Sequence, residues 1–278
     1  MSIPPSAALR TGYAEVIGDP IAHSKSPMIH GFWLEKLGID ADYRAHHVTP
    51  ETLADYFASR KDDPDWRGCN ITIPHKESAL DHVEDRGALR GSIGAINTVL
   101  RDADSALIGT NTDAAGFYAP IADMALEGAE VALVGAGGAA RAVLFALKRA
   151  GAGPVTILNR TPLKGAALLA AFGLKGDAVP LDAPLPPVSL VVNASPLGMT
   201  GQDALRLDLD ALPEDAVVYD LVYAPLETDL LAAARDRDLA AIDGLEMLIG
   251  QAAIAFELFF GKAPPRDDDE ELRELLTR

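Results

Sequence analysis

Side chains able to transfer a proton occur early in the chain, directly after short apolar runs. The most distinctive is Lys76, which ends the run NITIPHK at residues 70–76. Pro74 is expected to end a strand, so that Lys76 falls in the first turn of a following helix. The N-terminal end of a helix is positive, so a lysine is unfavourable there and its neutral form is favoured. A lysine in that position suits acid–base catalysis near neutral pH.

Other polar side chains stand at neighbouring predicted strand ends. In a strand, Asn70 and Thr72 point to one face. The pair Asn97-Thr98 forms a further polar cluster. Asp113 stands just before residues 114–126, which are predicted to form a long helix. Its carboxylate is a helix N-cap or the partner of a catalytic group, and the two roles are compatible.

A short polar loop at residues 23–27 has the sequence His-Ser-Lys-Ser-Pro. Pro27 suits the first position of a helix, and Ser26 suits the N-cap. Ser24 and Ser26 also form a pair of neutral donors beside a helix N-terminus, which suits a carboxylate ligand. The spacing alone leaves open whether the serines bind a ligand or only cap the helix.

A glycine-rich turn, GAGGAA at residues 135–140, matches the dinucleotide-binding pattern G-x-G-x-x-G/A. An apolar strand precedes the turn and a helical segment follows it, which is the context that the pattern requires. Gly135 allows the tight turn, and Gly137 lets the backbone approach a pyrophosphate bound at the helix N-terminus. The predicted cofactor contacts of this turn are Gly135, Ala136, Gly137, Gly138 and Ala139.

The next strand of this unit ends in Leu158-Asn159-Arg160-Thr161. NAD-binding domains commonly carry an acidic residue at this strand end, where it binds the ribose hydroxyls. Here Arg160 stands instead, and a guanidinium pairs with a phosphate through two charge-assisted bonds. The segment therefore predicts NADP(H) rather than NAD. The predicted contacts are Asn159, Arg160, Thr161 and Lys164.

Short β-type runs alternate with helical spacing along most of the chain, which is typical of α/β proteins with mostly parallel sheets. Candidate strands are residues 14–17, 43–48, 69–73, 95–101, 106–110, 131–134, 155–158, 189–193, 216–220 and 239–242. Candidate helices are residues 27–37, 52–59, 139–150, 164–171, 226–235 and the amphipathic tail 266–278. Residues 95–110 are predicted as a hairpin, and 178–188 as a Pro-rich connection.

The length of 278 residues corresponds to about two domains. A first domain of about 110 residues precedes a cofactor domain that opens near residue 130. From the pattern alone, the helices after Gly244 could pack on either domain.

The composition excludes several classes of function. The chain has 24 basic and 41 acidic residues, a net charge of −17, whereas nucleic acids and anionic membranes require clustered basic residues. A single cysteine, Cys69, excludes a disulfide framework. The first residues lack a signal-peptide pattern, and no apolar run reaches membrane-spanning length, so a cytoplasmic enzyme is expected.

No metal site is expected. The six histidines and Cys69 show no H-E-x-x-H pattern and no Cys/His ligand spacing. His46 and His47 would point to opposite faces of a strand.

Taken together, these residues show that the sequence resembles the shikimate dehydrogenase family over nearly its whole length. The motifs that carry the resemblance are IAHSKSP (21–27), NITIPHK (70–76), GAINT (94–98), NTD (111–113), GAGG (135–138), NRT (159–161), YDLVY (219–223), DGL (243–245) and QAA (251–253).

The resemblance implies NADPH-dependent reduction of 3-dehydroshikimate to shikimate, on the route to chorismate and the aromatic amino acids. It implies that Lys76 is the acid–base residue, with Asp113 beside it. The implied substrate contacts are Ser24 and Ser26 for the carboxylate, and Thr72, Asn97, Asp113, Tyr223 and Gln251 on the hydroxyl side. Leu221, Gly244 and Met247 would approach the nicotinamide.

The implied architecture is α/β with two domains. Residues 1–113 and 244–278 would form a discontinuous substrate domain with a mainly parallel sheet. Residues 114–243 would form a Rossmann-type NADP-binding domain, with the active site in the cleft between the two. The implied partner is the small-molecule substrate, without nucleic acid or membrane, and a homodimer is a candidate assembly.

Two alternatives stay open. A quinate/shikimate dehydrogenase that uses NAD would tend to carry an acidic residue at the cofactor strand end and a threonine in the serine loop, so Arg160 and Ser24/Ser26 argue against it. The presence of both Lys76 and Asp113 argues against a non-catalytic NADP-binding regulator.

The sequence departs from the family pattern at two positions. Lys164 stands where many members have a second arginine, and Glu246 where a glycine is common. The sequence alone does not show what Glu246 changes near the nicotinamide.

Overall fold

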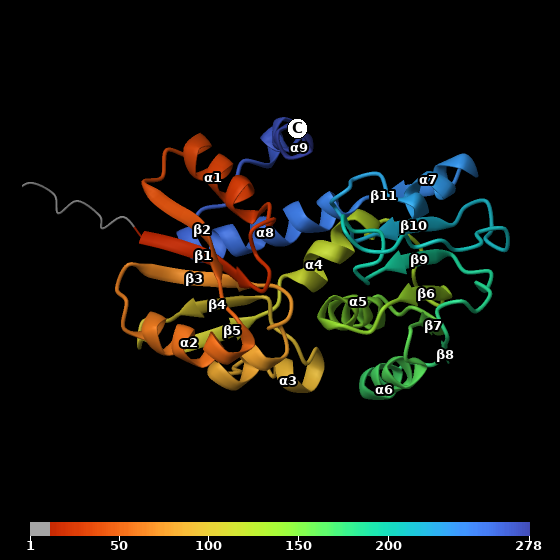
Figure 1. Ribbon diagram of the computed structural model, residues 1–278, viewed down its shortest axis with the longest axis horizontal. Helices are drawn as coiled ribbons and strands as arrows, with labels where there is room; N and C mark the ends of the chain where they lie inside the picture. The colour runs from red at the N-terminus through yellow and green to blue at the C-terminus, as the bar shows by residue number, and fades with distance from the viewer. Residues whose placement is uncertain (1–11) are drawn as a thin grey trace, which may run out of the picture.

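The computed structural model describes residues 12–278. The expectation that the first residues form no signal peptide therefore falls largely on residues outside the described part. The described chain forms two α/β domains that lie side by side, each built on its own sheet (Figure 1).

The first sheet has five strands in the order β2-β1-β3-β4-β5. The strands are β1 (Gly12–Gly18), β2 (Ala41–His47), β3 (Trp66–Ile71), β4 (Thr98–Arg101) and β5 (Leu107–Thr110). β1 pairs in parallel with β2 and β3, whereas β4 pairs antiparallel with both β3 and β5. The predicted hairpin is therefore confirmed as β4 and β5. The β3–β4 pairing makes the sheet mixed rather than mainly parallel.

Helices cover both faces of the first sheet. Successive side chains of a strand point to opposite faces. Val16 accordingly packs in a cluster with Trp33 of α1 (Ser26–Lys36), and Ile17 in a cluster with Phe57 of α2 (Leu53–Lys61). A four-residue helix, α3 (Leu89–Ser92), precedes β4.

The second sheet is parallel throughout, with the order β11-β10-β9-β6-β7-β8. The strands are β6 (Val131–Val134), β7 (Val155–Leu158), β8 (Ala178–Val179), β9 (Leu190–Asn193), β10 (Val217–Asp220) and β11 (Ala240–Ile242). The helices that accompany it are α5 (Gly138–Arg149), α6 (Pro162–Phe172) and α7 (Asp229–Asp236).

β6 shows why this sheet is parallel and covered on both faces. All four of its residues are buried, and the strand is apolar throughout, as expected for a parallel strand between two helical layers. Leu133 packs with Leu144 of α5 on one face, while Val134 packs with Leu231 of α7 on the other.

The chain passes between the two sheets twice. It leaves the first sheet through α4 (Asp113–Tyr118) and returns through α8 (Gly244–Phe260), which packs on α1, β3 and β4. α4 and α8 touch at Gly116, where a Cβ would lie 2.7 Å from the backbone nitrogen of Gln251. Glycine at this position therefore allows the two connecting helices to pack closely. The last helix, α9 (Asp269–Thr277), packs on α1 and confirms the predicted amphipathic tail.

Three local predictions are wrong. The helix predicted at 114–126 ends at Tyr118, because Pro120 lacks an N–H and restricts the residue before it; one 3₁₀ turn, Ala119–Ile121, follows. No α-helix begins at Lys76: it lies in a turn before a short 3₁₀ helix, Ser78–His82. The argument from the helix dipole therefore does not apply to Lys76. The Pro-rich connection begins with a two-residue edge strand, β8, which is too short to recognise from its pattern.

Within residues 12–278, no helix is both long enough and apolar enough to span a bilayer. The same residues contain no group of three or more His, Cys, Asp or Glu side chains that could hold a metal ion.

Candidate active site

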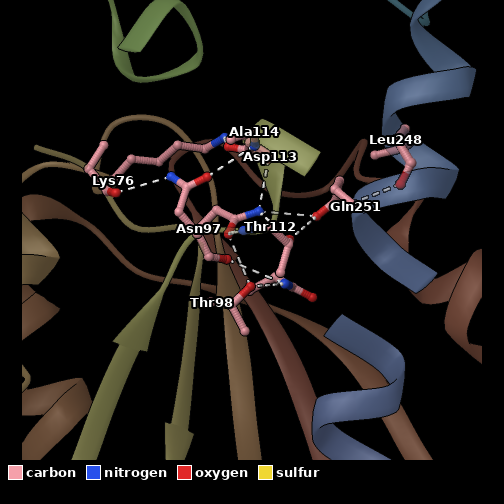
Figure 2. A network of polar contacts seen from close by, with 11 residues as sticks. Lys76, Asn97, Thr98, Thr112, Asp113, Ala114, Leu248 and Gln251 are labelled. Carbon is pink, nitrogen blue, oxygen red and sulfur yellow. Dashed lines mark hydrogen bonds and ion pairs between the residues drawn. The ribbon is translucent and has the colours of Figure 1, made fainter. Parts of the chain in front are cut away.

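A lysine and a carboxylate from different segments meet beside the end of the first sheet. The ammonium nitrogen of Lys76 lies 2.5 Å from Oδ2 of Asp113, and the side chains of the two residues are 16% and 5% exposed. Asn97 donates to Oδ1 of the same carboxylate over 2.8 Å. Asp113 is therefore held on one side by an amide and presents its other oxygen to the lysine (Figure 2).

Asn97 is the centre of a wider hydrogen-bond network. Its amide nitrogen also lies 3.2 Å from Oε1 of Gln251 on α8, and its oxygen accepts from the backbone N–H of Thr112 over 2.7 Å (Figure 2). Asn70 donates to Thr98, the residue after Asn97, over 3.0 Å. These side chains come from β3, β4, α8 and the segments that lead into β4 and α4, so the network fixes these elements relative to one another.

Asp113 is not an N-cap. It is the first residue of α4, and Asn111 accepts a hydrogen bond from the N–H of Ala114 instead. The carboxylate of Asp113 is thereby left for Lys76 and Asn97.

The serine loop connects to the same network through a buried tyrosine. The hydroxyl of Tyr43 donates to Asn70 over 2.7 Å, and the side chain of Ser26 lies near the same phenol. Burial raises the pKa of Tyr43 well above its usual value, so the phenol stays neutral. Ser26 is the first residue of α1 and not its N-cap, and its N–H donates to Oγ of Ser24 over 3.3 Å. The two serine side chains thus lie at the start of α1.

Two predicted substrate residues stand apart from this network. Thr72 lies one residue beyond the end of β3, with its methyl group close to Gly18. Tyr223, on the loop after β10, packs against the cluster formed by α1 and α8, and burial raises the pKa of its phenol. Within residues 12–278, no hydrogen bond joins either side chain to Asn97 or Asp113.

The glycine turn has the geometry that a dinucleotide needs. Gly135 has φ +104°, and a Cβ there would lie 3.0 Å from the carbonyl oxygen of Ala194. Gly137 is the N-cap of the twelve-residue α5 and lies beside open space. Among residues 12–278 no side chain caps α5, so its N-terminal N–H groups are open to an anion.

The predicted phosphate contacts lie at the end of β7. Arg160, Thr161 and Lys164 are exposed there, around the start of α6. The amide of Asn159 donates to the carbonyl of Thr161 over 2.9 Å and shapes this loop. In the part of the chain that the structure describes, Arg160 forms no ion pair with a carboxylate. Its guanidinium is thus available to a phosphate, which fits a phosphorylated dinucleotide.

The residues expected near the nicotinamide also lie together. Gly244 begins α8, and a Cβ there would lie 2.4 Å from the carbonyl oxygen of Leu221. Leu221 and Met247 pack in the same apolar cluster of the second domain. Only glycine permits this approach of α8 to the loop after β10.

The two domains touch at Lys76. A Cβ on Gly138 would lie 3.2 Å from the Cβ of Lys76, so the stem of the lysine lies against the glycine turn. Arg141, one turn further along α5, lies 3.2 Å from Oε2 of Glu77. The lysine that would transfer a proton is therefore next to the turn that would bind the dinucleotide.

The sequence reasoning missed a buried polar group in the second domain. Asn193, at the end of β9, donates to Asp220 over 2.8 Å, and Thr228 donates to the same carboxylate over 2.7 Å. Burial raises the pKa of Asp220. A polar residue at the end of a buried strand was the available signal, as it was at Asn70 and Arg160. Tyr43 gave no such signal, because its role depends on tertiary contacts.

This arrangement can supply one proton to an oxygen of a ligand held between the serine loop and the glycine turn. Lys76 is placed to be that donor, because Asp113 contacts its ammonium.

Comparisons with known proteins agree along the chain. A profile described as shikimate dehydrogenase substrate binding domain matches residues 16–99, and one described as shikimate 5'-dehydrogenase C-terminal domain matches residues 244–272.

Individual relatives match nearly the full length. The chain is 66% identical to a shikimate dehydrogenase (NADP(+)) of Sphingopyxis alaskensis, over 95% of this chain and 97% of that protein. It is 45% identical to one of Methylobacterium radiotolerans, over 92% and 94% of the two chains. A crystal structure of shikimate 5-dehydrogenase from Thermus thermophilus, in complex with NADP(H) and shikimate, has a TM-score of 0.83 at 39% identity. The match covers 96% of this chain and 100% of that one.

Proposed function

The chain belongs to the shikimate dehydrogenase family, and we propose that Lys76 and Asp113 perform the proton transfer of its reaction. The activity is the reversible, NADP-dependent reduction of 3-dehydroshikimate to shikimate, a step in aromatic amino acid biosynthesis. One observation carries the assignment of the catalytic pair: the 2.5 Å contact between Nζ of Lys76 and Oδ2 of Asp113, beside the glycine turn.

We propose that Ser24 and Ser26 bind the substrate carboxylate. Both lie at the start of α1, where the helix dipole favours an anion, and both offer hydroxyl donors. Hydroxyl donors also add no further cation that could compete with Lys76 for Asp113. The proposed contacts on the hydroxyl side of the ring are Thr72, Asn97, Asp113, Tyr223 and Gln251.

When bound, NADPH would supply the hydride for C3 of 3-dehydroshikimate. As negative charge develops on the carbonyl oxygen, the ammonium of Lys76 stabilises it and gives up a proton from Nζ. Asp113 holds the ammonium toward that oxygen, while Asn97 keeps the carboxylate in place. In shikimate oxidation the same group accepts the proton.

We propose the cofactor contacts from the structural features that fit a phosphorylated dinucleotide. The uncapped N-terminus of α5 would hold the pyrophosphate, and Arg160, with Thr161 and Lys164, the 2′-phosphate. Leu221, Gly244 and Met247 would border the nicotinamide. An exposed guanidinium at a strand end without an acidic residue favours NADP(H) over NAD.

We propose the boundaries 1–113 plus 244–278 for the substrate domain and 114–243 for the cofactor domain. Two packing observations support them: Leu245 and Phe256 of α8 share a cluster with Trp33 of α1, and Phe117 of α4 packs in the core of the second sheet. A cytoplasmic enzyme and a homodimer are also proposed. Light scattering of the purified protein tests the dimer.

Absorbance at 340 nm tests this function directly, with shikimate or quinate as substrate and NADP⁺ or NAD⁺ as cofactor. We expect fast NADP⁺ reduction with shikimate and little with the other pairings. Activity with quinate and NAD⁺ instead would overturn the phosphate role of Arg160. A folded protein that binds NADPH but is silent in all four assays would contradict the proposed catalysis and favour the regulator.

A further inference from the structure

The C-terminal helix α9 contacts both ends of α1. Leu272 and Leu276 are buried in the cluster that contains Trp33 of α1. Lys36, the last residue of α1, lies 2.5 Å from Oε2 of Glu271. At the opposite end, the ammonium of Lys25 donates to the backbone carbonyl of Leu276. The two helices therefore run antiparallel, and α9 holds the residue that separates the two serines.

The same helix reaches the start of α8. The guanidinium of Arg273 lies 2.7 Å from Oδ2 of Asp243 and 2.8 Å from Oε1 of Glu246. Asp243 is the N-cap of α8, because its other oxygen accepts from the N–H of Leu245 over 2.9 Å. Arg273 thus fixes the carboxylate that caps this helix.

The first turn of α8, directly after Asp243, packs on Leu221. Gly244 donates to the carbonyl of Val222 over 3.2 Å, and a Cβ on Gly244 would overlap the carbonyl of Leu221. Because this contact is so close, a small shift of Asp243 must move the first turn of α8. That turn carries Met247, whereas Gln251, one turn later, is held by its hydrogen bond with Asn97.

We infer that α9 sets the separation between the carboxylate-binding loop and the nicotinamide-facing turn, through Lys25 and Arg273. This inference rests on the proposed function. Both are positioning residues: Lys25 acts on the serine loop, and Arg273 acts on Asp243. It also gives Glu246 a role, as the second carboxylate that orients Arg273. Ion pairs near the surface contribute little to stability, whereas the placement of binding groups affects turnover.

Lys25 and Arg273 act on different ends of the site, so we expect their substitution to change different kinetic constants. We expect Lys25→Met to raise the KM for shikimate about fivefold, with the KM for NADP⁺ within about twofold of wild type. We expect Arg273→Ala to raise the KM for NADP⁺ about fivefold and to lower kcat about threefold, with the KM for shikimate little changed. Arg273→Lys, which keeps one ion pair, should restore most of both values.

Lys36→Met is the matched control, because it removes another α1–α9 ion pair that lies away from both ends of the site. We expect it to keep all three constants near wild type. The inference is wrong if Lys36→Met changes the kinetic constants as the other two variants do. It is also wrong if Lys25→Met and Arg273→Ala change every constant in parallel, because α9 then only stabilises the fold.

If the wild-type protein does not oxidise shikimate, the proposed function is wrong, and this result is independent of the role of α9. Affinities for shikimate and for NADPH, measured by calorimetry on the same variants, then still distinguish the role of Lys25 from that of Arg273. Thermal unfolding confirms that each variant is folded. Equal affinities of all variants for both ligands would overturn the positioning role.

Discussion

The ammonium of Lys76 and the carboxylate of Asp113 meet at 2.5 Å although they stand 37 residues apart, one in a turn and the other at the start of a helix. Two further contacts keep them there. The backbone carbonyl of Lys76 accepts from the N–H of Ile96, and Asn97 donates to Asp113. Neighbouring residues of one segment thus hold both members of the pair.

Replacing Lys76 by alanine removes the proton donor and leaves the substrate contacts in place. We expect Lys76→Ala to lower kcat by about 10²–10⁴, with little change in KM, since this is the usual scale for a positioned acid–base group. Steady-state kinetics in both directions measures it. A near-normal kcat in a folded variant would remove Lys76 from the mechanism.

Replacing Asp113 by asparagine keeps the shape of the side chain and the oxygen that Asn97 contacts. The neutral amide no longer holds the ammonium, so we expect kcat to fall by about 100-fold, the lower end of the acid–base range. Circular dichroism should show an unchanged fold. Full activity in Asp113→Asn would mean that Asn97 and the backbone alone position Lys76.

Replacing Arg160 by alanine removes the proposed phosphate contact. We expect weaker NADPH binding by about 1.5–3 kcal/mol, the scale of a hydrogen bond to a charged group. Fluorescence titration with NADPH and with NADH measures the difference, and NADH binding should stay the same. Arg149→Ala, at the C-terminal end of α5, is the control. An unchanged affinity for NADPH contradicts the proposed role of Arg160.

A methyl group on Gly116 cannot fit between α4 and α8, since it would lie 2.7 Å from the backbone of Gln251. We expect Gly116→Ala to cost about 1–3 kcal/mol in the free energy of unfolding, as overpacking does. It should also lower kcat, because both Asp113 and Gln251 must move. Gly31→Ala is the matched control on helix α1, where the space is open, and should stabilise by about 0.5–1 kcal/mol. Denaturant unfolding that ranks the two variants in the opposite order would contradict this packing.

His30 makes the stability of the first domain sensitive to acid. Its ring stacks on Tyr43 with centroids 3.8 Å apart, and within the described chain neither ring nitrogen has a hydrogen-bond partner. Burial lowers the pKa of His30 to about 3. The unfolded state therefore binds the proton first as the pH falls. This stability is fully present above about pH 6.5, and below that it is lost by about 1.4 kcal/mol per pH unit until about pH 3.

The test compares wild type with His30→Phe, in which the aromatic stacking is kept and no group titrates. We expect the unfolding free energies of the two to differ by about 2 kcal/mol more at pH 5 than at pH 7. His82→Phe, at a half-buried histidine that stacks on Phe57, is the control. Parallel pH dependence of wild type and His30→Phe would show that His30 does not cause the effect.

Local sequence patterns correctly predicted the strands whose apolar residues are also the buried ones in the structure. The apolar strands β6 and β7 begin and end at the predicted residues, because each is buried and bounded by turn residues. One argument for Lys76 relied on an expected helix that does not form. The motif NITIPHK, which ends in Lys76, is the signal that holds.

Other features depend on contacts that no local pattern contains. Tyr43 connects the serine loop to Asn70 across the first sheet, and Arg273 reaches Asp243 from a helix 30 residues further along the chain. Pro120 did carry a readable signal for the end of α4. The buried group around Asp220 carried one too, in the polar residues at the strand ends.

The chain connects its two domains twice, through α4 and α8, and this affects how the domains could move relative to each other. Two covalent connections that pack together at Gly116 restrict how the domains could rotate relative to each other. Asp113 and Gln251 belong to these two connections, α4 and α8, whereas β8 lies at one edge of the second sheet, next to β7 (Figure 1). A rotation restricted in this way would displace Arg160, which follows β7, more than it would displace Asp113.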